Sequence, residues 1–277
     1  MPSRLLLAPA IAALMAAPAA TAGGPGSPPA TPAVTIVSVE YGFTLPASVA
    51  AGPTVLRLSN HGKTVHHVTL IRLENGKRVA DLVTTLSKPG PPPTWAVPVG
   101  GPNAVDPGGS SSAVVDLRPG RYAVVCFVPD PDGKPHFMKG MARELLVTGV
   151  APKAAPPTRP EMTIQLADYG FTYPGELTAG EHHLRVHNTA TQPHELVLFR
   201  LAAGKTTKDF VAWAQGGMKT MPPGSFEGGA SPMAPGMDND IIVNLRAGHY
   251  VLVCFVEDAR DGKPHLVHGM MREVSIN

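Results

Sequence analysis

Short apolar or alternating stretches, separated by glycine, proline and asparagine, recur along most of the chain. Such stretches are typical of β-strands, because successive side chains of a strand face opposite sides of its sheet. In the first half, the predicted strands cover residues 34–39, 54–58, 68–73, 113–117, 122–128 and 144–147. Residues 209–215 are predicted as a short helix and residues 89–107 as a long loop. The pattern predicts an all-β fold.

The pattern occurs twice, which indicates an internal duplication. Residues 40–44, Glu-Tyr-Gly-Phe-Thr, return as residues 168–172, Asp-Tyr-Gly-Phe-Thr, and the offset stays constant as far as the cysteines. The two units are predicted at 35–149 and 161–277, joined by a proline-rich linker at 150–160. Units of this length with many short strands are typical of Greek-key β-sandwiches, so we expect two such sandwiches in tandem.

The N-terminus has the pattern of a secretory signal peptide, predicted at 1–22. Arg4 precedes an apolar run at 5–17, and Ala20-Thr21-Ala22 is a small-residue cleavage site. A flexible leader at 23–34 is expected to follow, and the protein is predicted to be periplasmic or secreted. The apolar run is too short to span a membrane, and no later stretch is long enough to insert into one.

The charge of the chain argues against two classes of partner, nucleic acid and anionic membranes. The formal net charge is only +2, and lysine and arginine do not cluster. Nucleic acid and anionic membranes are therefore not expected to bind the chain. The sequence does not identify a protein partner or an oligomeric state.

The two cysteines of the chain lie in two similar segments. Residues 120–144 read GRYAVVCFVPDPDGKPHFMKGMARE, and residues 248–273 read GHYVLVCFVEDARDGKPHLVHGMMRE. Each cysteine is followed by a histidine and then a methionine, which are ligands that suit soft copper ions. Cysteines in an exported protein commonly pair, but equivalent core positions of two separate units rarely lie at bonding distance. A disulfide is therefore not expected.

A mononuclear blue-copper site also needs a second histidine, from a distant strand. His66 and His67 are adjacent and leave the choice open in the first half. In the second half only His194 is available; it matches His66, and Glu195 matches His67. The predicted ligand sets are His66, Cys126, His136 and Met141 in the first unit and His194, Cys254, His265 and Met270 in the second.

These residue types suit single-electron transfer. A thiolate stabilises Cu(I) and also bonds to Cu(II), two imidazoles complete a trigonal plane, and a weak axial thioether tunes the reduction potential. We expect one copper per unit and two per chain. Met138 is an alternative axial ligand, but only Met141 has a methionine counterpart in the second unit.

The motif G-x-Y-x-x-x-C…H-x-x-x-G-M, with N-x-x-x-x-x-H upstream, resembles that of the cupredoxin family over nearly all of both units. The resemblance implies sandwiches of cupredoxin type and type 1 copper sites. The long loop between cysteine and histidine resembles that of copper nitrite reductases. Those enzymes and the multicopper oxidases connect type 1 copper to a catalytic copper through a histidine beside the cysteine. Here Phe127 and Phe255 follow the cysteines, and the chain has no His-x-His pair, so an enzyme is not expected.

A second function remains open at this level, which is copper handling or delivery. The second unit has five methionines without a methionine counterpart in the first: Met218, Met221, Met233, Met237 and Met271. Thioethers in a segment rich in glycine and proline can hold Cu(I), or they can cover an apolar surface. His268, where the first unit has Lys139, is a further possible metal contact, although a surface position is the simpler interpretation. Asn60 and Asn188 can orient the ligand loops or serve as turn residues.

Overall fold

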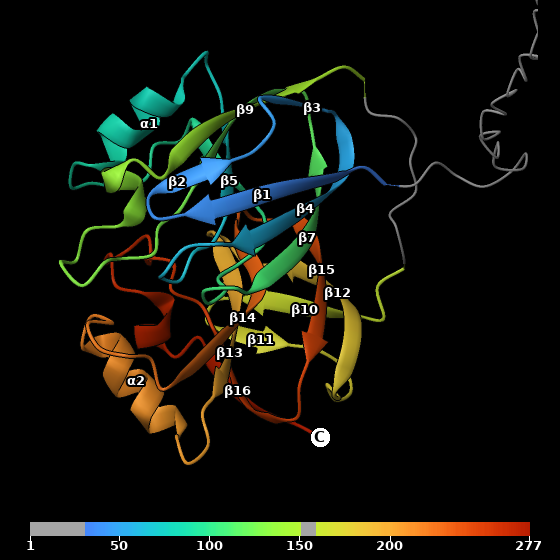
Figure 1. Cartoon of the computed structure of the whole chain (residues 1–277), viewed down its shortest axis with the longest axis vertical. Helices are drawn as coiled ribbons and strands as arrows, with labels where there is room; N and C mark the ends of the chain where they lie inside the picture. Colours follow the sequence, from blue (N-terminus) through green and yellow to red (C-terminus); the bar gives the residue numbers. More distant parts are fainter. Residues whose placement is uncertain (1–30, 151–158) are drawn as a thin grey trace, which may run out of the picture.

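The computed structural model describes residues 31–150 and 159–277, drawn in Figure 1. The predicted signal peptide lies outside the described residues, as do most of the predicted leader and linker. Ala33 and Val34, at the end of the predicted leader, belong to the first strand. Among the described residues, no helix combines the length and the apolar character that crossing a membrane requires.

The strands form two similar series, one in each half of the chain. In the first half they are β1 (Ala33–Val39), β2 (Gly42–Thr44), β3 (Ser48–Ala50), β4 (Gly52–Asn60), β5 (Thr69–Leu73), β6 (Ala96–Gly100), β7 (Ser110–Leu117), β8 (Gly120–Val125) and β9 (Ala142–Thr148). In the second half they are β10 (Met162–Ala167), β11 (Gly170–Thr172), β12 (Gly180–Asn188), β13 (His194–Leu201), β14 (Gly224–Met233), β15 (Asp238–Leu245), β16 (Gly248–Val253) and β17 (Met271–Ile276). The helices are α1 (Val79–Leu86) and α2 (Thr207–Gln215), with 3₁₀ turns η1 (His136–Lys139) and η2 (His265–His268).

Both sheets pass through both halves of the protein. Within the described residues, one sheet has eight strands in the order β11-β10-β12-β15-β7-β4-β1-β2. The other has nine, in the order β17-β16-β13-β14-β6-β5-β8-β9-β3. Each order reads outward from its centre through equivalent strands of the two halves, with β3 as an addition at one edge. The halves are therefore related by a pseudo-twofold axis and form one continuous pair of sheets, not two sandwiches held together by the linker alone.

The seam between the halves consists of strand pairs in each sheet. Strands β7 and β15 pair antiparallel, with Ala113 opposite Ile241. In the other sheet β6 meets β14 at Val99 and Met233. The seam also explains why position 100 is a glycine. Its φ is +96°, and a Cβ atom there would lie 1.9 Å from the Asn239 Oδ1 atom of the other half. Because the innermost strands pair across the seam, neither half exposes them as sheet edges.

The hydrophobic core lies between the two sheets and is shared by both halves. Leu56 and Leu70 from the first half and Leu184 and Leu198 from the second are buried in one cluster. Helices α1 and α2 cover the outside of the nine-stranded sheet, each with its own small cluster (Figure 1). The fully buried Phe210 anchors α2, and burial of such a side chain contributes about 2–3 kcal/mol.

The local predictions were correct for strands and for one helix. The helix predicted at 209–215 is α2, which begins at a capping box between Thr206 and Asp209. The loop predicted at 89–107 was wrong in part, because it contains strand β6, paired with β5 on one side and β14 on the other. Helix α1 was not predicted, although apolar residues at 79, 82, 83 and 86 have helical spacing.

Candidate metal centres

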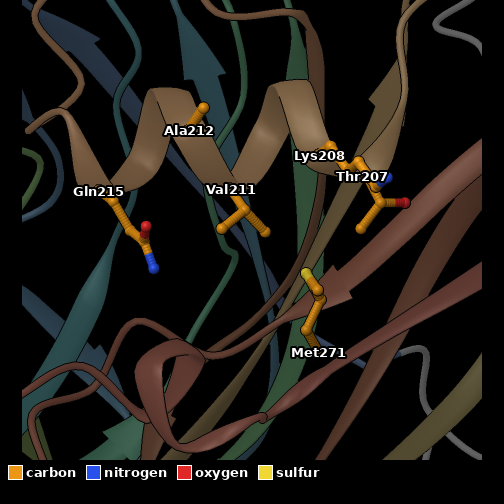
Figure 2. A pocket seen from close by; sticks show the side chains of 6 residues that line it. All are labelled: Thr207, Lys208, Val211, Ala212, Gln215 and Met271. Carbon is orange, nitrogen blue, oxygen red and sulfur yellow. The ribbon is translucent and has the colours of Figure 1, made fainter.

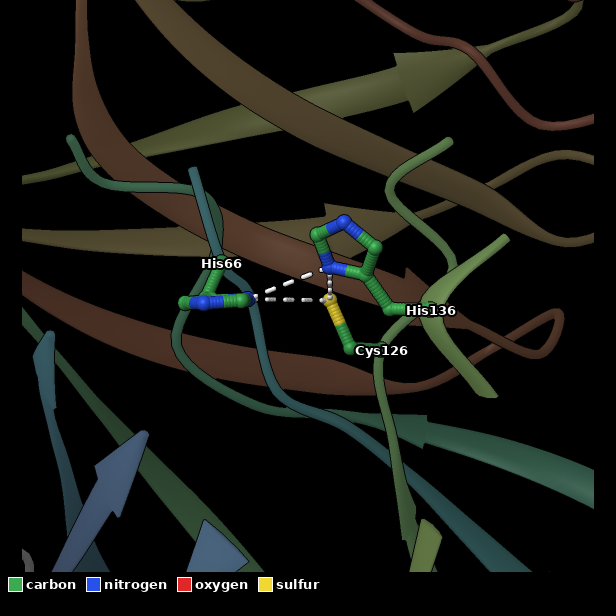
Figure 3. Close-up of side chains that lie close together, drawn as sticks. All are labelled: His66, Cys126 and His136. Carbon is green, nitrogen blue, oxygen red and sulfur yellow. Dashed lines mark hydrogen bonds between the residues drawn. The ribbon is translucent and has the colours of Figure 1, made fainter. Parts of the chain in front are cut away.

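The first candidate centre joins three side chains from three segments of the first half. Cys126 follows β8 directly, His136 begins η1, and His66 lies between β4 and β5. The Nδ1 atoms of His66 and His136 lie 3.1 Å apart, and they lie 4.0 and 3.6 Å from the Cys126 Sγ atom. Figure 3 shows these atoms pointing toward one another. All three residues are at most 1% exposed.

Backbone hydrogen bonds tie the cysteine to the other two residues of its loop. The Cys126 N–H donates to the Met141 carbonyl at 3.2 Å, and the Met141 N–H donates to the His136 carbonyl at 3.1 Å. Met141 is fully buried in the same core cluster as Cys126. The loop therefore brings the predicted axial methionine to the residues of the trio.

The second centre repeats this arrangement. The Nδ1 atoms of His194 and His265 lie 3.8 and 3.4 Å from the Cys254 Sγ atom, and the two imidazole centroids are 4.3 Å apart. The Cys254 N–H donates to the Met270 carbonyl at 3.3 Å, and the Met270 N–H donates to the His265 carbonyl at 3.0 Å. All four predicted ligands are fully buried.

The spacing of each trio fits one metal ion. Nitrogen ligands about 2.0–2.1 Å and a sulfur ligand about 2.3 Å from an ion, at 120° to one another, are about 3.5–3.8 Å apart. The separations in both trios scatter around these values. Neither cysteine forms a disulfide, as expected from their separate positions in the duplication. Two imidazoles and one thiolate are a donor set suited to copper.

Burial sets the protonation of the ligands. Desolvation raises the pKa of the Cys126 thiol to about 12, and the pKa of Cys254 is also raised by burial. Desolvation lowers the pKa of His66 and of His265 to about 4, with a smaller contribution from the other histidine of each trio. The imidazoles are therefore neutral and ready to bind a metal, whereas a cation is needed to stabilise the thiolates.

Carboxylates lie behind the ligand histidines. Asp130 lies 3.2 Å from the Nε2 atom of His136, and Asp168 lies 2.5 Å from the Nε2 atom of His194. Carboxylates in this position orient a ligand imidazole and raise its basicity. Their counterparts in the duplication are more distant, with Glu40 at 4.0 Å from His66 and Asp258 at 3.7 Å from His265. Sequence reasoning missed all four, although each acid recurs at the same place in both units.

Asn60 and Asn188 organise the loops that carry the upstream histidines. The Asn60 Nδ2 group donates to the carbonyls of Thr64 at 2.8 Å and Val105 at 3.0 Å, and its Oδ1 atom accepts from the Gly62 N–H at 2.9 Å. Asn188 makes the equivalent three bonds in the second half. Both side chains are fully buried, so they fix the loops before His66 and His194 in addition to serving as turn residues.

His67 and Glu195 stand next to the trios but outside them. The His67 Nε2 atom accepts a hydrogen bond of 2.7 Å from the Phe127 N–H, the amide that follows Cys126. The Glu195 Oε1 atom accepts the equivalent bond, 3.0 Å, from the Phe255 N–H. Of the adjacent histidines, it is His66 whose Nδ1 atom faces Cys126.

The extra methionines of the second half do not form one exposed cluster. Met233 is fully buried, and Met237 packs against the core, whereas Met221 is 92% exposed. Met271 lines a surface pocket of about 330 Å³ under α2, shown with its apolar wall in Figure 2. None of the eight predicted ligands lines this pocket.

His268 and Met138 lie toward the surface. The His268 Nε2 atom is 3.1 Å from Asp261, and together with Asp258 these residues form a group that could hold a cation. This group includes neither Cys254 nor His194. Met138, the alternative axial ligand, is 42% exposed.

No protein-family model matches the sequence, and no curated protein matches it. Among solved structures, similar chains include a dithionite-reduced auracyanin from Roseiflexus castenholzii, with 19% identity, a TM-score of 0.30, and coverage of 44% of this chain and 100% of the other. Auracyanin A, a "blue" copper protein from Chloroflexus aurantiacus, has 18% identity and a TM-score of 0.30 over 42% of this chain and 99% of its own. A multicopper oxidase has 14% identity and a TM-score of 0.28 over 91% of this chain and 93% of its own.

The likeness to these neighbours is weak and by itself shows neither the fold nor the function of this chain. They include both blue copper proteins and oxidases, so they do not separate a carrier from an enzyme. At TM-scores of 0.30 and below the likeness is partial. The argument for copper therefore depends on the two trios described above.

Proposed function

We propose that the protein is an exported carrier of single electrons, with one type 1 copper site in each half. Copper would be held by His66, Cys126, His136 and Met141 in the first site and by His194, Cys254, His265 and Met270 in the second. The observation that carries this proposal is the pair of buried His-Cys-His trios, each with a cysteine and a histidine from a loop that ends at a buried methionine. Copper bound there would supply a one-electron couple.

Burial of the ligands favours electron transfer over catalysis on a bound substrate. Catalytic copper requires an open coordination position, whereas the trios and their methionines are at most 1% exposed. Within the described ranges, the remaining group of possible ligands is Asp258, Asp261 and His268, which holds a single histidine. Phe127 and Phe255, not histidines, follow the ligand cysteines. We therefore propose that the chain is neither an oxidase nor a nitrite reductase.

The same proposal includes the organisation of the chain. The signal peptide at 1–22 would direct export to the periplasm or the outside of the cell. The units would be 35–149 and 161–277, joined by the linker at 150–160. A redox partner protein would supply or accept the electron.

The decisive experiment loads the mature chain with Cu(II) and measures copper content and visible absorption. Two coppers per chain with an intense thiolate-to-copper band are expected. Cys126→Ser and Cys254→Ser should each remove one copper and about half of the band, since each site has its own thiolate. A variant that keeps the full band would falsify the assignment of that site.

The same samples test the other functions. Colourless protein that binds several Cu(I) ions would favour copper handling, and Met221→Leu would then lower the number bound. Turnover of nitrite, or of oxygen with an electron donor, by purified two-copper protein would contradict the carrier. In the carrier, Met221→Leu leaves copper content and colour unchanged.

A further inference from the structure

His67 and Glu195 occupy equivalent positions in the two halves, each next to the upstream histidine of its site. Each side chain accepts the amide N–H that follows the ligand cysteine, at 2.7 Å from Phe127 and 3.0 Å from Phe255. The two residues are 7% and 4% exposed, so both lie in the protein interior. The two halves thus place different chemical groups at the same point beside the sulfur ligand.

The hydrogen bonds of Glu195 identify its side chain as a carboxylate. Its Oε1 atom accepts from the Phe255 N–H, and its Oε2 atom accepts from the Asn103 Nδ2 group at 2.9 Å. The Asn103 amide cannot turn round to accept instead, because its Nδ2 group also donates to the carbonyls of Leu196 and Ala230, at 3.1 and 3.0 Å. Both oxygens of Glu195 therefore face donors, which is the pattern of an ionised group.

His67, in contrast, carries no charge. Its Nε2 atom accepts from the Phe127 N–H, which the ring of a protonated histidine cannot do. Desolvation also lowers the pKa of His67 to about 4. At this position the second site therefore has a buried negative charge that the first site lacks.

The acids that lie behind the ligand histidines do not make this difference, because each site has two of them. Each site also has a basic side chain that pairs with one of its acids. In the first site Lys139 pairs with Asp130. In the second site Arg260 pairs with Asp258, at 3.2 Å. The contrast between His67 and Glu195 is therefore not offset by these neighbours.

On the basis of the function proposed above, we infer that Glu195 gives the second copper site the lower reduction potential, so that the first site is reduced first. A negative charge stabilises Cu(II) more than Cu(I), because the oxidised ion carries more positive charge. A carboxylate hydrogen-bonded to the amide after the ligand cysteine lies within about 10 Å of an ion on that sulfur, given ordinary bond lengths. At an effective dielectric constant of about 20, a unit charge at that distance shifts the electron equilibrium by roughly tenfold or more.

The two sites would then hold their electrons at different potentials. Each site takes up one electron, which the redox partner loses, and Cu(II) becomes Cu(I). With one electron per chain, the electron would reside on the first site. The second site would fill last and would be the first to give its electron away.

Single-site variants give the potential of each site separately. Cys254→Ser leaves the first site and Cys126→Ser leaves the second, and redox titration should give the lower potential for the second. In half-reduced wild type, the electron paramagnetic resonance signal of the remaining Cu(II) should match that of Cys126→Ser. Because desolvation raises the pKa of Glu195 to about 7, the potentials are measured at about pH 9, where this group is ionised.

Glu195→Gln, in the Cys126→Ser background, tests the charge itself. Glutamine keeps an acceptor for the Phe255 N–H, and the main-chain N–H of the same residue still lies beside the Cys254 Sγ atom, 3.5 Å away in the wild type. The potential of the second site should rise by an amount that corresponds to a shift of roughly tenfold or more. Glu181→Gln removes the same charge from an exposed position of β12 and should leave this potential unchanged.

The reverse exchange can be made in the first half. His67→Glu, in the Cys254→Ser background, should lower the potential of the first site, because it adds the charge that Glu195 supplies to the second. If Glu195→Gln does not fold, Glu195→His places the residue of the first half in the second, and it should raise the potential of the second site.

The outcomes separate the two proposals. Equal potentials, or a higher potential for the second site, overturn the inference while leaving the copper sites intact. A Glu195→Gln variant that moves the potential no further than Glu181→Gln also overturns it. Protein that takes up no copper overturns the proposed function, and the copper count reveals this before any potential is measured.

Discussion

Replacing Asn60 with alanine tests whether its side chain holds the loop that carries His66 in place. The fully buried side chain donates to Thr64 and Val105 and accepts from Gly62, and Ser38 donates to it at 3.3 Å. At roughly 1 kcal/mol net for each hydrogen bond, the loss amounts to about 4 kcal/mol. The Val105 carbonyl keeps a partner in the His66 N–H, which lowers the expected loss to about 3 kcal/mol.

The assay is urea unfolding of the metal-free protein, so that copper binding does not contribute. Because both sheets run through both halves, we expect a single transition. A loss of about 3 kcal/mol corresponds to a fall in Tm of about 6–12 °C for a chain of this size. Asn188→Ala should have a similar effect, since Asn188 makes the equivalent bonds. Asn244→Ala, at an exposed position of β15, should change the free energy of unfolding by less than about 0.5 kcal/mol.

The copper-loaded variants then locate the damage. Asn60→Ala should weaken the absorption of the first site and Asn188→Ala that of the second, because each residue braces the loop of one upstream histidine. A stability loss below about 1 kcal/mol, or one no larger than that of Asn244→Ala, would refute the reasoning. So would equal damage to both sites by one variant.

Three further substitutions test the Tyr122 hydroxyl, the negative charge behind a copper ligand and the packing at the seam. Tyr122→Phe removes a hydroxyl that donates to the Arg118 carbonyl at 2.8 Å and accepts from the Arg118 N–H at 3.1 Å. Urea unfolding should therefore show a loss of about 1–2 kcal/mol in the free energy of unfolding, and a changed copper content would contradict a purely structural role. Asp130→Asn removes the negative charge behind His136, one of the proposed copper ligands. Redox titration of the first site, in the Cys254→Ser background, should therefore give a higher reduction potential, and a lower potential would be inconsistent with this account. Gly100→Ala should lower stability or prevent folding, as judged by circular dichroism and urea unfolding, because its Cβ atom meets Asn239. Gly76→Ala, at φ +71° with no atom within 4 Å of the added Cβ, should cost only about 1–2 kcal/mol of backbone strain, and equal effects of the two changes would exclude the clash.

Local sequence patterns were sufficient for most secondary structure. The strand predicted at 34–39 is β1 and the helix predicted at 209–215 is α2, because burial on one face leaves a periodic trace in the sequence. Strand β6 was missed, because Ala-Val-Pro-Val-Gly contains residues that strands normally avoid. Its conformation depends on pairing with β5 and β14, which no local pattern records.

The candidate site divides in the same way. The order of cysteine, histidine and methionine in one loop, repeated at a second place, was enough to single out residues that the fold does bring together as trios. The acids behind the histidines were not selected, because Asp130 and Asp168 are ordinary loop residues until the fold brings them to an imidazole. Asn60 was also undervalued, since its four bonds join segments distant in sequence.

The sequence by itself determined the duplication, the strand-rich class and the two possible ligand sets, because each is written in residues at short or constant spacing. Only the tertiary structure decided how the halves meet. Periodicity records which face of a strand is buried but not which edge pairs with which, so two separate sandwiches and one continuous pair of sheets have the same pattern. The seam also brings the Asn103 side chain of the first half to 2.9 Å from Glu195 of the second half. That contact joins positions 92 residues apart in the chain, and because hydrogen bonds between distant segments leave no local pattern, only the folded structure shows it.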